Sequence, residues 1–229
     1  MDFLNSSVFF GTVLSLLAYF LGFYLKKLIK KNWFNPFLFA VILVIVILLI
    51  FKIPYKTFYN SSKYLDFLLT PATVCFAIPL YEKTHILKKN FKAIAIGILT
   101  GVITSLSCIW AAAKIFGFTH NEYVTMLPKS VTVAIGMDLS KSLGGYTGIT
   151  VAVITITGIT GSVLCPFLCK IFKIQSSVAK GVGIGSCSHI LGTSEAYNLG
   201  ETEGAVSSLS LVIAGILTVF AAMLFSNLH

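Results

Sequence analysis

Long apolar runs follow one another along the chain, separated by short polar or basic segments. The first two runs cover residues 6–25 and 33–51, and four Lys lie between them in residues 26–31. A helix needs about 20 apolar residues to cross the hydrocarbon core of a bilayer. Because basic loops stay on the cytoplasmic side, the pattern predicts that the N-terminus is outside the cell. No basic segment precedes the first run, so we expect an anchor and not a cleaved signal peptide.

Five further segments are long enough to cross a membrane, and they differ in kind. Three are clear apolar spans: 91–116, 146–172 and 204–225. Two are interrupted, namely 65–81, which contains Pro71 and Pro79, and 178–197, which is rich in Gly and polar residues. Proline disrupts a helix interior, and a broken helix survives in lipid only where protein or a watery cavity satisfies its backbone.

Residues 126–145 are too short and too polar for an ordinary span. We expect this segment to be re-entrant or partly inserted, because the later cluster of Lys170, Lys173 and Lys180 then falls inside the cell, whereas a full span would put that cluster outside. The whole pattern predicts an all-α polytopic membrane protein with about seven transmembrane segments, two or three of them broken or re-entrant. We expect residues 1–229 to form one integral membrane domain.

An internal repeat is predicted from two proline-containing segments. The segment that starts at Pro71 matches the one that starts at Pro128 in its proline, its hydroxyl residue two positions on and its Ala-Ile pair. The same offset places Gly101, Ser105 and Cys108 over Gly158, Ser162 and Cys165. We therefore predict a duplication of about 66–116 and 128–173, as transporters often show.

Composition excludes several classes of protein. Hydrophobic residues make up 56% of the chain and charged residues 11%, with a mean hydropathy of +0.91, whereas a soluble domain carries about 25% charged residues. A water-soluble enzyme, a nucleic-acid-binding module and a disordered scaffold are therefore excluded. The net charge of +9 comes from 17 Lys, with no Arg, that mostly flank the apolar runs. We interpret the five Cys as buried small hydrophobes, and we expect no metal and no cofactor.

Lys129 and His189 are the first candidates for chemistry within the apolar segments. A charge at membrane depth costs at least ~3 kcal/mol and marks a functional site, but a lysine near the interface can also extend its ammonium to water. His189 is either a structural residue or a functional one, as a hydrogen-bond donor or a proton relay. Glu203 is either a cap of the last span or a coupling residue. No catalytic set of residues is present at suitable spacing, so we expect no enzyme.

Three segments resemble signatures of the LrgB/CidB family. Residues 127–140 resemble its PKSVT signature, residues 185–193 with 203–205 its SHxxGT…EGA signature, and residues 69–81 its PATV segment. The order and spacing agree over roughly residues 5 to 226. This resemblance implies a bacterial plasma-membrane protein described in two ways. One is an antiholin-like regulator of murein hydrolase activity and autolysis that acts with a small LrgA/CidA-type partner, and the other is a carrier of small monocarboxylates such as pyruvate, lactate or glycolate.

With the repeat and the resemblance together, we expect a carboxylate site between the segments around Pro71, Pro128 and His189. Lys129 would be the counter-charge to the substrate, and His189 and Glu203 possible coupling residues. The expected substrate-binding residues are Pro71, Thr73, Pro128, Lys129, Ser130, Thr132, Ser188, His189, Gly192 and Thr193. A pore-forming holin is the rival interpretation, but holins usually have two or three amphipathic spans without broken helices. A homo-oligomer is possible, and a regulator without transport stays an alternative.

Overall fold

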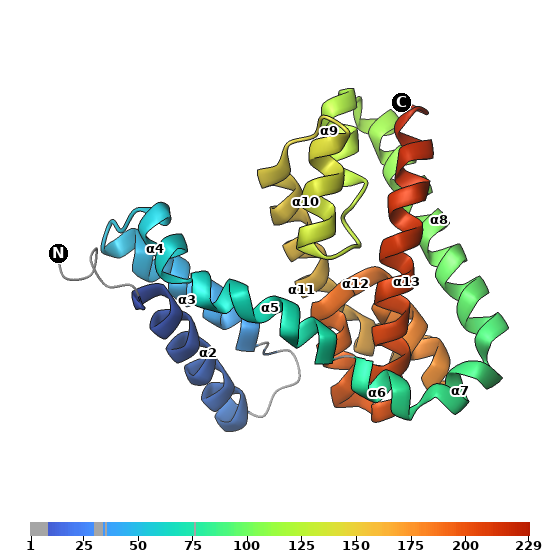
Figure 1. The fold of residues 1–229 in the computed structure, drawn as a ribbon, viewed down its shortest axis with the longest axis horizontal. Helices are drawn as coiled ribbons and strands as arrows, with labels where there is room; N and C mark the ends of the chain where they lie inside the picture. Colours follow the sequence, from blue (N-terminus) through green and yellow to red (C-terminus); the bar gives the residue numbers. More distant parts are fainter. Residues whose placement is uncertain (1–8, 30–33, 35, 76) are drawn as a thin grey trace. The chain divides into compact units, whose positions relative to one another are not determined.

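The computed structural model describes residues 9–29, 34, 36–75 and 77–229, and in this part of the chain all regular structure is helical (Figure 1). The side chains of residues 66, 69, 70, 72, 73, 77, 79 and 80 lie outside the description. The chain divides after Cys75 into two compact units.

Unit 1 packs its helices through small residues. It contains α2 (Phe10–Ile29), α3 (Pro36–Ile50), α4 (Tyr55–Ser61) and α5 (Lys63–Cys75). A methyl group added to Gly22 would lie 2.7 Å from the Pro36 carbonyl oxygen, so only glycine allows α2 and α3 to approach this closely. The Gly11 backbone N–H donates to Ser61 Oγ at 2.9 Å, which ties α2 to α4.

The segment 65–81 is interrupted in the structure, but the interruption does not lie at Pro71. Helix α5 runs through Pro71 without interruption and ends at Cys75, and α6 begins at Ala77. A proline removes one intrahelical hydrogen bond, and this helix continues in spite of that loss. The Thr73 side chain, expected at the site, lies outside the described residues.

Unit 2 is built around α8. The unit contains α6 (Ala77–Glu82), α7 (Thr84–Lys89), α8 (Phe91–Phe116), α9 (His120–Met126), α10 (Val133–Ser142), α11 (Thr147–Ile171), α12 (Ser177–Leu199) and α13 (Glu201–Ser226). Buried residues recur on α8 every three or four positions and face a common core: Ile94, Ile98, Val102, Leu106, Ile109 and Ala113. This spacing puts them on one helix face.

Helices α9 and α10 form hairpin 1, which covers residues 120–142. Its entrance is fixed by a capping box, in which Thr119 caps α9 and the Thr119 backbone N–H and hydroxyl both donate to the Glu122 carboxylate at 2.8 Å. These hydrogen bonds lower the pKa of Glu122. The end of α9 and the last turns of α10 are held together at the start of α11, because the Tyr146 N–H donates to Thr125 Oγ1 at 2.8 Å and the Thr150 hydroxyl lies 2.7 Å from Ser140 Oγ and 3.1 Å from the Thr125 carbonyl. Residues 127–132 form the non-helical tip 1.

Helix α12 is hairpin 2, because it turns back on itself at His189. His189 has φ 41° and ψ −138°, far from helical values. A methyl group on Gly192 would lie 3.2 Å from the carbonyl oxygen of Ile184. In a continuous helix eight residues advance about 12 Å, so this contact requires the second half of α12 to fold against the first. We call residues 186–189 tip 2.

The two hairpins enter unit 2 from opposite ends. At the end of α13, the Tyr123 hydroxyl donates to the Phe225 carbonyl at 3.0 Å, so hairpin 1 enters there. At the start of α13, Lys83 pairs with Glu201 at 2.9 Å, and Gly181 lies against the Glu203 backbone. Only Gly200 separates the last residue of α12 from α13, so both ends of hairpin 2 lie at this end (Figure 1).

These findings confirm part of the predicted topology. Four described helices are long and apolar enough to cross a membrane, namely α2, α8, α11 and α13, and α3 is a shorter apolar helix. Residues 178–197 were expected to be interrupted, and in the structure the interruption is a reversal, because both ends of α12 lie beside the start of α13. The seven segments and the internal repeat stay predictions.

Candidate functional site

The two hairpin tips meet side by side on α8. Ser105 Oγ on α8 lies 3.2 Å from Ser130 Oγ of tip 1, within hydrogen-bond distance. One helical turn earlier, a methyl group on Gly101 would lie 3.2 Å from Ser186 Oγ of tip 2. Residues 101 and 105 are both near the middle of α8, so the tips meet about halfway along this helix.

Helix α11 also packs against tip 2 and against hairpin 1. His189 Nε2 donates to the Ile154 carbonyl at 2.9 Å. A methyl group on Gly158 would lie 2.6 Å from His189 Nε2, and one on Gly161 would lie 2.6 Å from Ser188 Cβ. The two glycines therefore make the space that tip 2 occupies. Ile154 also contacts Gly136 of hairpin 1, so one turn of α11 touches both hairpins.

The backbone of tip 2 is held in place by hydroxyl groups. The Thr193 hydroxyl donates to the His189 carbonyl at 2.9 Å and lies 2.9 Å from Ser207 Oγ on α13. The positive φ of His189 is costly for a residue with a side chain, by roughly 1–3 kcal/mol. Its imidazole is 4% exposed. A strained residue held by packing and hydrogen bonds on all sides is typical of functional sites.

Lys129 brings a positive charge to this meeting point. Its side chain is half-buried, and Nζ donates to Ser130 Oγ at 3.3 Å. Lys83–Glu201 is the only ion pair among the described residues, so within them Lys129 has no carboxylate partner. A half-buried cation in a segment of this kind is a candidate for binding an anion.

The start of α10 adds to this positive region. Thr132 is the N-cap of α10, and its side chain makes no capping hydrogen bond. The first N–H groups of a helix lack intrahelical partners and carry partial positive charge. Lys129 and these N–H groups together suit a small anion. No group of three metal-ligating side chains occurs in the described part of the chain.

The structure brings most of the predicted site residues into two groups. Tip 1 contains Pro128, Lys129, Ser130 and Thr132, and tip 2 with the following turn contains Ser188, His189, Gly192 and Thr193. Pro71 and Thr73 belong to α5 of unit 1. Glu203 is buried in the first turn of α13, beside Gly181 and Gly200.

Sequence reasoning missed three residues that shape the site, namely Ser105, Gly158 and Gly161. The sequence did contain a signal, since Gly101 and Ser105 fall opposite Gly158 and Ser162 in the predicted repeat. The interpretation of the cysteines as buried is wrong. Cys75, Cys108 and Cys187 are exposed, and Cys165 and Cys169 are half-buried. An apolar neighbourhood does not imply burial when the outer surface itself is apolar.

Comparison with known proteins identifies the family. The LrgB-like family matches residues 15–228. The chain is 34% identical over 210 residues to "Holin-like protein CidB" of Staphylococcus epidermidis strain RP62A, covering 90% of this chain and 92% of the relative. It is 32% identical over 206 residues to the Staphylococcus aureus Mu50 protein of the same name, covering 90% of each.

A third relative has a different name. The chain is 34% identical over 223 residues to "Antiholin-like protein LrgB" of Bacillus subtilis strain 168, covering 97% of this chain and 96% of the relative. No solved structure matches significantly. Four apolar helices fit a bilayer environment, and the named relatives are bacterial. The chain is a multi-pass membrane protein that belongs to the LrgB-like family.

Proposed function

We propose that this protein transports small monocarboxylates of the pyruvate, lactate and glycolate class across the bacterial plasma membrane, and thereby influences autolysis. The proposal rests on the position of Lys129. Lys129, without a carboxylate partner among the described residues, lies where the tips of two hairpins meet. Carriers commonly bind anions between broken helices whose N-termini point at the substrate.

The opposite entry of the hairpins supports this proposal. Unit 2 has seven lysines at or near the end where α13 begins: Lys83, Lys88, Lys89, Lys92, Lys170, Lys173 and Lys180. Only Lys114 and Lys141 lie in the last turns of α8 and α10, toward the other end. By the positive-inside rule the lysine-rich end faces the cytoplasm. Hairpin 1 then enters from outside and hairpin 2 from inside, so each hairpin is placed to gate one side of the site.

Each residue of the site has its own role in the proposed transport. Lys129 neutralises the substrate carboxylate, while the Ser130 and Thr132 hydroxyls and the N–H groups at the start of α10 donate hydrogen bonds to it. His189 relays a proton, with Glu203 as a further coupling group. The duplication of 66–116 and 128–173 and a total of about seven transmembrane segments belong to this proposal. A plasma-membrane orientation with the N-terminus outside also belongs to this proposal.

A second candidate is a regulator that does not transport. The relatives are named holin-like and antiholin-like, which favours a protein that restrains murein hydrolases through an LrgA/CidA-type partner. In that case the anion site has no transport role. Neither candidate is an enzyme.

Uptake into liposomes separates the two candidates. Purified protein is reconstituted, and entry of labelled pyruvate is measured with and without an inward proton gradient. Saturable uptake that unlabelled lactate or glycolate inhibits supports the carrier. No uptake above empty liposomes, even with an LrgA-type partner added, supports the regulator and overturns the carrier.

The position of His189 yields a prediction about transport. Gly158→Ala places a methyl group 2.6 Å from the original position of His189 Nε2, so the imidazole must leave the Ile154 carbonyl. A displacement of this size at a site costs up to about 100-fold in rate, and we expect uptake to fall by at least about 10-fold. Gly148→Ala on the same helix is the matched control, because nothing lies within 4 Å of its added methyl group. Equal uptake by the two variants would contradict the role of His189.

A further inference from the structure

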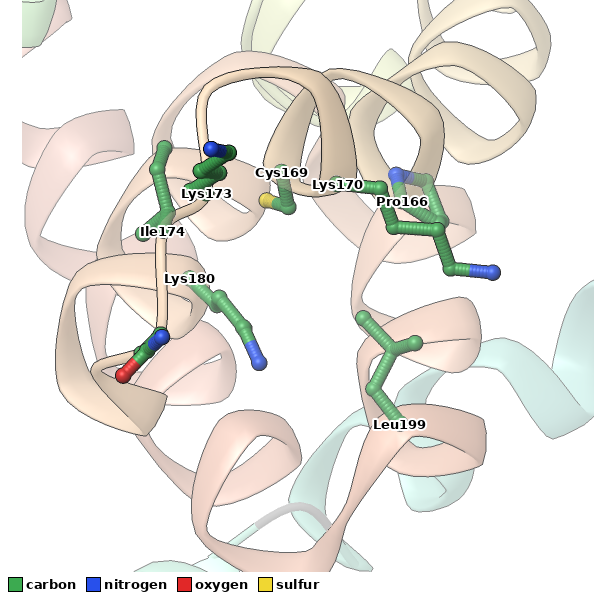
Figure 2. Close-up of a pocket in the computed structure, with 8 residues that line it drawn as sticks. Pro166, Cys169, Lys170, Lys173, Ile174, Lys180 and Leu199 are labelled. Atoms are coloured by element: carbon green, nitrogen blue, oxygen red, sulfur yellow. The ribbon is translucent and has the colours of Figure 1, made fainter.

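A cationic cavity lies at the lysine-rich end of unit 2. It has a volume of about 510 Å³ and is lined by the end of α11, the turn after it and both ends of hairpin 2: Pro166, Cys169, Lys170, Lys173, Ile174, Gln175, Lys180 and Leu199. Figure 2 shows Lys173 and Lys180 on one side of the opening and Lys170 on the other. None of the residues predicted for the monocarboxylate site lines it.

The charges around this cavity are unbalanced. Its lining contains three lysines and no carboxylate. None of these lysines forms an ion pair among the described residues, where Lys83–Glu201 is the only one. Three ammonium groups around one cavity exceed the charge of a monocarboxylate. They match a phosphate group, whose oxygens accept several charge-assisted hydrogen bonds.

The surroundings favour a lipid as the source of the phosphate. Phe167, Leu168, Ile171 and Phe172 next to the cavity are 41–70% exposed, so the outer surface of α11 at this level is apolar. Pro166, Ile174 and Leu199 add apolar groups to the cavity itself. A basic pocket between helices beside an apolar surface on the cytoplasmic side is the arrangement that binds anionic lipid headgroups.

We propose that this cavity binds the phosphate group of an anionic phospholipid of the inner leaflet. The bound headgroup joins the end of α11 and the turn after it, through Lys170 and Lys173, to the start of hairpin 2, through Lys180. It thereby stabilises the base of the hairpin that carries His189.

Lipid binding to the purified full-length protein tests this site. Native mass spectrometry measures the affinity for phosphatidylglycerol and phosphatidylcholine, and thermal unfolding is followed with each lipid and with inorganic phosphate. The test variant is Lys170→Gln/Lys173→Gln/Lys180→Gln. The control is Lys88→Gln/Lys89→Gln/Lys92→Gln, which removes the same charge outside the cavity. At about 5-fold per lysine, we expect the test variant to lose on the order of 100-fold in phosphatidylglycerol affinity and the control to stay near wild type.

Every result of this lipid-binding experiment either supports or overturns the proposed site. Preference for phosphatidylglycerol over phosphatidylcholine that only the test variant loses supports the lipid site. Stabilisation by inorganic phosphate, lost in the same variant, supports the phosphate site with a free anion as its source. Equal losses in the two triple variants mean diffuse surface charge and overturn the proposal, as does the absence of any preference in the wild type. These readouts do not depend on transport, so their failure is distinct from a failure of the carrier proposal.

Discussion

Replacing Lys129 with alanine should lower saturable monocarboxylate uptake by about 10- to 100-fold. The ammonium is the charged group of tip 1 and has no carboxylate partner among the described residues. A hydrogen bond to a charged group contributes about 1.5–3 kcal/mol, which corresponds to this range of affinity. Uptake of labelled pyruvate into liposomes at several substrate concentrations measures the effect. Lys129→Arg, which keeps the charge, should retain part of the uptake.

Lys141→Ala is the matched control for this experiment. Lys141 lies in the last turn of α10, is exposed, and belongs to the same hairpin. Its removal changes the net charge equally but leaves the tip intact, so uptake should equal that of the wild type. Uptake by a folded Lys129→Ala protein at the wild-type level would remove Lys129 from the site.

Gly185→Ala should destabilise the protein by about 1–3 kcal/mol, the usual cost of an overpacked interior. The added methyl group would overlap the Ser207 carbonyl oxygen and lie 2.8 Å from Ser207 Cα. These are backbone atoms, so α12 and α13 must move apart. The melting temperature of the detergent-solubilised protein should fall by several degrees.

Gly183→Ala separates this packing effect from helix propensity. Gly183 lies on the same half of α12, and nothing is within 4 Å of its added methyl group. Alanine is favoured over glycine in a helix by roughly 1 kcal/mol, so this variant should be as stable as the wild type or more stable. A Gly185→Ala protein that melts no lower than Gly183→Ala would contradict the close crossing of α12 and α13.

The sequence predicted the long helices well because their signal is local. The expected span 91–116 coincides with α8, and the expected spans 146–172 and 204–225 agree closely with α11 and α13. Residues 126–145 were correctly separated from ordinary spans, because polarity and length alone distinguish them. The proline signal was less reliable, since α5 continues through Pro71.

The sequence alone does not predict that α12 reverses its direction. Glycines and polar residues in 178–197 predict an interruption, but a kinked crossing and a hairpin leave the same local pattern. What decides between them is long-range contact, namely Gly192 against Ile184 and Gly185 against Ser207. The candidate site also depends on contacts between residues that are far apart in the sequence. Lys129 and His189 could be selected as unusual residues, whereas the contact of Ser105 with Ser130 depends on how deep hairpin 1 reaches along α8.

The most direct test is the topology of hairpin 1, because the account requires tip 1 to reach the middle of the membrane and return. Single cysteines are introduced at Asn121, Lys141 and Lys88, which are exposed, in a chain whose five native cysteines are replaced by serine. A membrane-impermeant maleimide is applied to right-side-out and inside-out vesicles. We predict that Asn121→Cys and Lys141→Cys react from the same side and Lys88→Cys from the other. Reaction of Asn121→Cys and Lys141→Cys from opposite sides would make hairpin 1 a crossing helix and contradict the account.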